Sequence, residues 1–327
     1  MDGPLRATRL RRPKRIRFEL IPVQKYGRND GHANFKSSAG STRARVRERR
    51  RYLSSLKIML KAACQILFAA TLVISANSAG ASSCNDPFAF PAWLEEIKRE
   101  AATQGISPRG IAALNGLTYD AAVISSDRRQ GVFRQSFEQF SGRMVPPRLS
   151  RGLQMMKRHA ALLSRIEHQF GVSPAVIVAI WGLETDFGAD SGRFQTLRAL
   201  ATLAYDCRRP EKFRPELFDA LRIVARGDMS PSEMRGAWAG EIGQTQFMPS
   251  SYLKFAVDYD GNGRRDLIHS VPDVLASTAN YLRGYGWQRG APYGPGTKNF
   301  EVILAWNKAQ VYARTIAYFA ERLEGTR

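Results

Sequence analysis

The chain has 327 residues and a formal net charge of +20, and this charge is unevenly distributed. Residues 1–81 contain 18 Lys and Arg against 4 Asp and Glu, a net charge of +14, which leaves +6 for the remainder. The basicity therefore belongs mainly to the N-terminal part. An arginine-rich tract could suggest nucleic-acid binding, but we favour the interpretation as part of an export signal and expect no nucleic-acid partner. The mild positive charge of the rest suits an anionic polymer or another acidic surface as partner.

Residues 1–58 are rich in arginine and show neither helical nor strand periodicity. Three interpretations stay open for this tract. It is an overlong basic start of a signal sequence, a consequence of a misassigned start upstream of Met59, or a disordered arm in the cytoplasm.

Residues 59–81 are predicted to form a signal peptide. An apolar run of 15 residues, 62–76, follows Lys57 and Lys61 and precedes a small-residue cleavage site. The run is too short for a comfortable membrane span. We therefore expect cleavage before Ser82, export to the periplasm, and no stable membrane span in the exported chain.

Cysteine usage agrees with export. Cys64 lies inside the predicted signal peptide, which leaves Cys84 and Cys207 as a pair in an oxidising compartment and predicts a disulfide bond between them. The alternatives are two free thiols, or a lipid on Cys84. The Ala-Ser-Ser sequence before Cys84 lacks the usual aliphatic residue, which argues against the lipid.

Helix signals dominate residues 82–327, which are long enough for one sizeable core or two closely packed lobes. The predicted helices cover Pro91–Gln104, Ser150–Phe170, Ser173–Phe187, Pro215–Arg226, Pro272–Arg283 and Lys308–Leu323. Strand-like runs are scarce, and Phe300–Leu304 is the clearest. The predicted fold class is mostly α, with a helical core, an N-terminal helical lobe and no appended binding domain.

Glu184 lies within the most apolar helical segment, Ser173–Gly188. Ile180 and Ile177 precede it by four and seven residues, so the carboxyl shares a stripe with aliphatic side chains. Burial disfavours the charged form, which predicts a raised pKa and a general acid that stays protonated near neutral pH. The alternative is a structural carboxyl satisfied by a buried arginine or backbone donor.

Several downstream residues suit a sugar ligand. Residues 236–252 combine closely spaced glycines with polar side chains, and glycine lets backbone approach a ligand closely. Tyr281, Trp306, Asn307 and Tyr312 offer flat aromatic surfaces and amide donors and acceptors. Each of them alone is more typical of a core or turn position.

Six motifs in one order, GLETDFG, YDCRRPEKF, AGEIGQTQFMPSSY, VDYDGNGRRDL, STANYLRGYGW and AWNKAQVYA, extend from about Trp93 to Leu323. In this order they resemble the lytic murein transglycosylase B family. The resemblance implies a periplasmic lyase with a lysozyme-like, α+β but mostly helical core. It also implies cleavage of the MurNAc-GlcNAc bond of peptidoglycan glycan strands without water, leaving a 1,6-anhydro sugar.

Residue by residue, the resemblance makes Glu184 the single catalytic acid and base, within the element ETDFG. It implies that residues 82–327 are the catalytic domain, acting as a monomer and needing no cofactor for catalysis. The implied glycan contacts are Arg208, Arg209, Gln246, Tyr281, Asn307 and Tyr312.

Some positions depart from the family pattern. Ala237 stands where some members have a serine, Glu241 replaces a small residue, and Trp306 replaces a tyrosine. The connection after the GYGW segment, about a dozen residues, is also shorter than in many members. These departures affect the expected substrate contacts and leave the acid in place.

Glycosidic cleavage by a single catalytic carboxyl is also chemically reasonable when the family resemblance is set aside. Glycosidases usually use two carboxyls, but a substrate N-acetyl group that assists the reaction makes the second one dispensable. Two alternatives stay open. Glu241 or Asp186 positions a water, which gives a lysozyme-type hydrolase, or the protein binds glycan strands without cutting them.

Residues 258–269, DYDGNGRRDLIH, match the first nine places of a calcium loop, with Gly263 at the sharp turn. The predicted ligands are Asp258, Asp260, Asn262, Arg264 and Asp266. Position twelve is His269 in place of the usual glutamate, so low affinity is expected unless Asp273 or a carbonyl compensates. The prediction is a structural calcium ion, and the alternative is a polar turn without metal.

Overall fold

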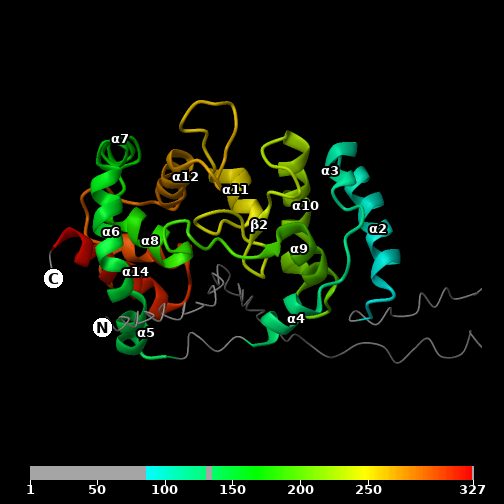
Figure 1. Ribbon diagram of the computed structural model, residues 1–327, viewed down its shortest axis with the longest axis horizontal. Coiled ribbons are helices and arrows are strands. Elements are labelled where there is room, and N and C mark those ends of the chain that lie inside the picture. Colours follow the sequence, from blue (N-terminus) through cyan, green and yellow to red (C-terminus); the bar gives the residue numbers. More distant parts are fainter. Residues whose placement is uncertain (1–85, 130–134, 326–327) are drawn as a thin grey trace, which may run out of the picture. The chain divides into compact units, whose positions relative to one another are not determined.

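The computed structural model describes residues 86–129 and 135–325. The predicted basic arm, signal peptide and Cys84 lie outside these residues, so the interpretations that depend on them stay predictions. Within the described residues the chain is mostly helical, as the sequence predicts (Figure 1).

The helices of the described residues are, in chain order, α2 (Phe90–Thr103), α3 (Pro108–Ala112), α4 (Ala121–Arg128), α5 (Phe137–Met144), α6 (Pro146–Arg158), α7 (Ala160–Phe170), α8 (Pro174–Thr185), α9 (Thr196–Tyr205), α10 (Pro210–Arg226), α11 (Pro249–Phe255), α12 (Val271–Gly284), α13 (Lys298–Trp306) and α14 (Gln310–Glu324). Two short strands, β1 (Phe194–Gln195) and β2 (Arg235–Gly236), pair antiparallel, with Phe194 opposite Gly236.

Helix α8 begins where its sequence predicts. The Ser173 hydroxyl accepts a hydrogen bond from the Ala175 N–H, and Pro174 occupies the first helical position, where its missing N–H costs nothing. The helix ends earlier than predicted, at Thr185, because Asp186 takes a left-handed conformation with φ of 53°. The chain therefore turns immediately after the candidate acid.

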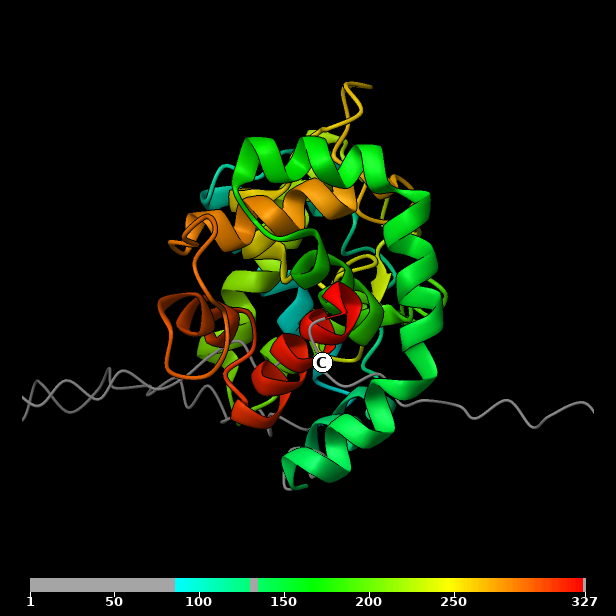
Figure 2. The same cartoon turned by 90° about the vertical axis from the view of Figure 1, so that its left-hand side faces the viewer.

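The helices pack in two sets of contacts. In one, α9 lies against α10, and α10 also contacts α3 and α11. In the other, α8 packs between α14 and α6, and the C-terminal helix α14, red in Figure 2, also contacts α5. Helix α12 contacts α7, α8 and α11. Residues of α8 from Ala175 to Thr185 are all buried, so this helix lies at the centre of the second set.

Among the described residues no single helix is long and apolar enough to cross a membrane, and one bent pair, α7 and α8 at 112°, passes such a test by length and composition only.

Three predicted elements are wrong or incomplete. The expected strand Phe300–Leu304 lies inside helix α13, since a short apolar run does not by itself distinguish a buried strand from a buried helix. The single helix expected over Ser150–Phe170 is two helices that meet at His159. Helix α10 begins at Pro210, earlier than predicted, and continues through Pro215, which lies inside the helix and removes one backbone donor.

Candidate active site around Glu184

Glu184 lies near the C-terminal end of α8 and is 4% exposed. Ile177 and Ile180 are fully buried beside it on the same helix, so the predicted apolar setting of the carboxyl is confirmed. A carboxyl in such a position needs specific polar neighbours, because burial without hydrogen bonds is costly for either of its protonation states. Those neighbours come from helices far along the chain.

The first neighbour is Trp306, the last residue of α13, whose indole Nε1 donates a hydrogen bond to Glu184 Oε1 at 2.7 Å. The Trp306 side chain is fully buried, and the rings of Phe247 and Tyr281 pack edge-on against it. The sequence identifies Trp306 as an aromatic residue suited to a sugar ligand and as a departure from the family tyrosine, and not as a partner of Glu184. Its contact with the candidate acid joins residues 122 positions apart, and no local pattern indicates it.

The second neighbour is Tyr312 on α14, a fully buried residue whose hydroxyl interacts electrostatically with the Glu184 carboxyl. Burial raises the pKa of Tyr312 well above its ordinary value, and the negative charge of Glu184 raises it further. The hydroxyl therefore stays protonated at physiological pH and is able to donate to the carboxylate. Tyr312 is one of the predicted glycan contacts, and the structure places it against the acid itself.

Arg148 on α6 is a buried residue that sequence reasoning missed. Its Nε donates to the Gly182 carbonyl at 2.9 Å, and its Nη1 donates to the Met144 carbonyl at 2.9 Å. Burial lowers the pKa of Arg148, while the charge of Asp186 opposes this shift. The guanidinium thus ties α6 to the last turns of α8, and a buried arginine beside this helix is not signalled by any motif.

Two other predicted contacts support Trp306 from outside. The Tyr281 hydroxyl donates to the Ala305 carbonyl at 2.8 Å, and its ring stacks on Tyr285 with centroids 4.6 Å apart. Asn307 follows Trp306 and ends α13, and its side-chain oxygen accepts from the Ala309 N–H at 3.0 Å. Both side chains are buried, and the Tyr281 ring packs against the indole, while Asn307 shapes the chain just after it.

The Gln246 side chain makes several hydrogen bonds to the backbone around the loop between β2 and α11. Its Oε1 accepts from the Ala237 N–H at 3.0 Å, and its Nε2 donates to the carbonyls of Gly243 at 2.7 Å and Ser191 at 3.0 Å. The loop also needs glycine, because a Cβ on Gly236 would lie 1.8 Å from the Glu241 carbonyl oxygen. Gln246 thus holds this loop together, and its predicted role toward a glycan stays a prediction.

Arg208 and Arg209, the arginine pair, converge on a single buried carboxylate. Arg208 Nη2 lies 2.5 Å from Asp127 Oδ2, and Arg209 pairs with Asp127 Oδ1. Asp127 also pairs with Arg128 at 2.8 Å, and Arg128 pairs in turn with Asp206. The arginine pair therefore lies in a charge network joining α4 to the turn between α9 and α10, and its predicted contact with a glycan stays a prediction.

The two carboxyls named as alternative water-positioning groups both lie near cations. Asp186 Oδ2 is 3.4 Å from Arg151 Nη1, and its Oδ1 is 4.0 Å from Arg148 Nε. Glu241 is fully buried, and its charge raises the pKa of Lys212 against the larger lowering effect of burial. Each of these carboxyls thus has a charge partner of its own, separate from the Glu184 contacts with Trp306 and Tyr312.

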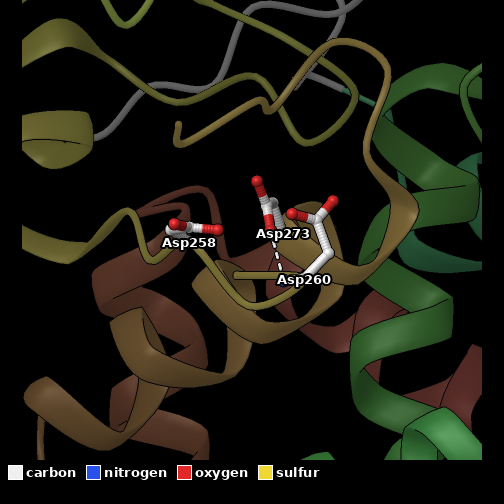
Figure 3. A group of neighbouring side chains, drawn as sticks. All are labelled: Asp258, Asp260 and Asp273. Carbon is white, nitrogen blue, oxygen red and sulfur yellow. Dashed lines mark hydrogen bonds between the residues drawn. The ribbon is translucent and has the colours of Figure 1, made fainter. Parts of the chain in front are cut away.

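The predicted calcium loop presents three carboxylates to one point. Oxygens of Asp258, Asp260 and Asp273 all lie within 4.8 Å of one another (Figure 3). Asp273, from the first turn of α12, also accepts from the N–H groups of Tyr259 at 2.7 Å and Asp266 at 2.8 Å. Carboxylate oxygens are the ligands that Ca²⁺ prefers in proteins. The three carboxylates gathered here therefore fit the ion.

The other predicted ligands take local roles. The Asn262 side-chain oxygen accepts from the Arg264 N–H at 2.9 Å, and Asp266 accepts from the N–H groups of Ile268 and His269. The acidic group found here is therefore made by two predicted residues and Asp273, the residue expected to compensate for the missing glutamate. Calcium binding itself stays a prediction.

The family model described as Transglycosylase SLT domain matches residues 89–297. The chain belongs to this family. Membrane-bound lytic murein transglycosylase B of Escherichia coli K12 is 38% identical to this chain over 149 residues. That match covers 45% of this chain and 41% of the relative, so it spans about two fifths of the relative's length. The predicted family is confirmed.

Solved structures agree with this placement. SltB3 from Pseudomonas aeruginosa, in complex with NAG-anhNAM-pentapeptide, is 31% identical, with a TM-score of 0.68 over 72% of this chain and 80% of that chain. Escherichia coli Slt35, in complex with calcium, is 23% identical with a TM-score of 0.63 over 72% and 93% of the two chains, which shows the fold alone. The predicted mostly helical, lysozyme-like fold of this chain is confirmed.

Proposed function

We propose that this SLT transglycosylase cleaves the MurNAc-GlcNAc bond of peptidoglycan without water, with Glu184 as its only acid and base. The observation that carries the proposal is a buried carboxyl, 4% exposed, held by Trp306 and Tyr312 in a domain of the transglycosylase SLT family. The SltB3 structures, whose ligands are NAG-NAM and NAG-anhNAM pentapeptides, support peptidoglycan as the substrate class.

The proposed reaction has two proton transfers. Glu184 gives its proton to the leaving glycosidic oxygen as the bond from that oxygen to C1 of MurNAc breaks. The C6 hydroxyl oxygen of the same sugar then bonds to C1, and its proton returns to the Glu184 carboxylate. No water is consumed, the carboxyl ends in its starting state, and the N-acetyl group of the substrate assists at C1 in place of a second carboxylate.

The surroundings of Glu184 suit both halves of this cycle. A buried setting favours the protonated acid needed first, and hydrogen-bond donors favour the carboxylate that forms after the proton leaves. Trp306 supplies such a donor, and Tyr312 places a neutral hydroxyl near the carboxyl, so neither residue adds a positive charge. One residue therefore serves both steps with little rearrangement of its neighbours, which is how preorganised sites lower a barrier.

The proposal also includes the cellular place and the calcium ion. We infer export through the signal peptide 59–81, because the substrate lies outside the cytoplasmic membrane. Asp258, Asp260 and Asp273 would hold a calcium ion, which would join the loop to the start of α12 and contribute stability. The catalytic steps use Glu184 alone.

The test is digestion of purified sacculi by the exported protein and by Glu184→Gln, with mass analysis of the products. The amide keeps the shape of the side chain and its acceptor oxygen for Trp306 but has no acidic proton. Wild type should release 1,6-anhydro ends, and the variant should lose about 100-fold or more of the rate. Reducing ends would identify a hydrolase, and an absence of products from wild type would identify a binding protein.

A further inference from the structure

The hydrogen bond between the indole of Trp306 and Glu184 distinguishes the two oxygens of the carboxyl. An indole N–H is a donor and cannot accept a hydrogen bond. The oxygen facing it, Oε1, must therefore present a lone pair in every state of the cycle. The carbonyl oxygen of a protonated carboxyl is a better acceptor than its hydroxyl oxygen, so the indole favours the form in which Oε1 is the carbonyl oxygen and the acidic proton lies on Oε2.

The indole is held firmly enough to impose this choice. Phe247 packs on it at 5.5 Å between ring centroids with an interplanar angle of 75°, and Tyr281 does so at 4.8 Å and 71°. Tyr281 is itself anchored by its hydroxyl to the Ala305 carbonyl. Close edge-on packing on a fully buried ring leaves it no room to turn its N–H elsewhere.

The tyrosine that the resembled family has at this position would not have the same effect. A phenolic hydroxyl both donates and accepts, so it is compatible with a proton on either carboxyl oxygen. Tyr312, whose hydroxyl interacts electrostatically with Glu184, has this adaptable chemistry. The acid thus has one neighbour of fixed hydrogen-bond direction and one whose hydroxyl can adjust.

We infer that Trp306 is a positioning residue that holds Oε1 of Glu184 as a permanent acceptor and makes Oε2 the oxygen that gives and retakes the proton. The inference deepens the proposed function and rests on it for the task of the carboxyl. The hydrogen bond itself is a property of the folded protein, so it can be tested apart from catalysis.

The experiment measures the titration of the Glu184 carboxyl directly, by NMR of protein carrying carboxyl-¹³C glutamate. The Glu184 signal is the one missing from Glu184→Gln. Trp306 is replaced by benzothienylalanine, which keeps the shape of the indole and has sulfur in place of the N–H, and in a second protein by Phe. Trp306→Tyr restores a donor. Trp181→Phe is the matched control, because its buried indole donates to Gln244 Oε1 at 2.8 Å and not to Glu184.

Loss of a donor to the carboxylate favours the protonated form, so the midpoint should rise by about one pH unit in the benzothienylalanine and Phe proteins. The alkaline limb of kcat/KM on sacculi should rise with it. Trp306→Tyr should return toward the wild-type midpoint, and Trp181→Phe should keep it. An unmoved midpoint in both donor-free proteins, or an equal rise in Trp181→Phe, would overturn the inference.

Product analysis of the wild-type enzyme separates this inference from the proposed function. A raised midpoint in a protein that releases no anhydro ends supports the positioning role and refutes the lyase. An unmoved midpoint in a protein that does release them refutes the positioning role and leaves the lyase standing.

Discussion

Calcium should raise the thermal midpoint of this protein through the group formed by Asp258, Asp260 and Asp273. Oxygens of the three carboxylates lie within 4.8 Å of one another. At that separation two unit charges repel by about 1 kcal/mol in water and by a few times more near a protein surface. A bound divalent cation removes this repulsion in the folded state, and the unfolded chain has no such group to offer.

The expected size follows from mass action. With calcium at about a hundred times its dissociation constant, the folded state gains about 2.7 kcal/mol. For a domain of this size each kcal/mol raises the midpoint by about 2–4 °C, so the rise should be about 5–10 °C. Magnesium should give a smaller rise, since it demands octahedral geometry and retains its water.

The assay is thermal unfolding in calcium and in chelator, for wild type and for the double variant Asp258→Asn, Asp260→Asn. The amides keep side-chain oxygens for the loop N–H groups that both residues contact, such as Asn262 N–H, and remove two negative charges. Asp190→Asn is the control, because Asp190 accepts from the Gly192 N–H in a similar turn outside the acidic group. Equal midpoints for wild type in calcium and chelator, or the same rise in the double variant, would refute the calcium site.

Three further predictions concern other parts of the structure. Asp127→Asn should weaken binding to glycan fragments and lower the thermal midpoint, because the arginine pair loses its shared buried carboxylate; unchanged affinity and midpoint, by calorimetry, would contradict this. The raised pKa of Tyr312 means that its contribution to stability is complete below the ordinary tyrosine value of 10.0 and is lost as pH rises further, so the free energy of unfolding should fall above pH 10.0, and less steeply in Tyr312→Phe. Denaturant titrations at several pH values would argue against it if the free energy of unfolding fell equally with pH in both proteins. Non-reducing peptide mapping of periplasmic protein should show Cys84 linked to Cys207, and in the loop-entropy model Cys84→Ser should cost roughly 4 to 5 kcal/mol; two alkylatable thiols, or a lipid on Cys84, would exclude the bridge.

Local chemistry explains what the sequence predicts correctly. Ser173 and Pro174 mark the start of α8, and Ser270 caps α12 two residues before the predicted region, because capping depends on side chains next to the helix end. The burial of Glu184 follows from the apolar composition of its own segment, since all residues from Ala175 to Thr185 are buried. Such features are determined within a few residues, so a single sequence is enough to find them.

The errors arise where distant residues decide the outcome. Residues Phe300–Leu304 of helix α13 resemble a strand in the sequence because their apolar run is short. The cap of the helix, the Thr297 hydroxyl that accepts from the Phe300 N–H, begins before that run. The contact of Trp306 with Glu184 joins two helices that are far apart in the chain. Asp127, which gathers the arginine pair, has no motif at all. Partners of this kind appear only when the helices are packed.

The most direct test of the central claim is mass analysis of sacculi digested by the wild-type protein beside Glu184→Gln. A lyase with one carboxyl predicts 1,6-anhydroMurNAc ends from wild type, no oxygen incorporated from ¹⁸O-labelled water, and at most about a hundredth of the rate from the folded variant. Reducing MurNAc ends carrying ¹⁸O, or a variant that retains more than about a tenth of the wild-type rate, would contradict it.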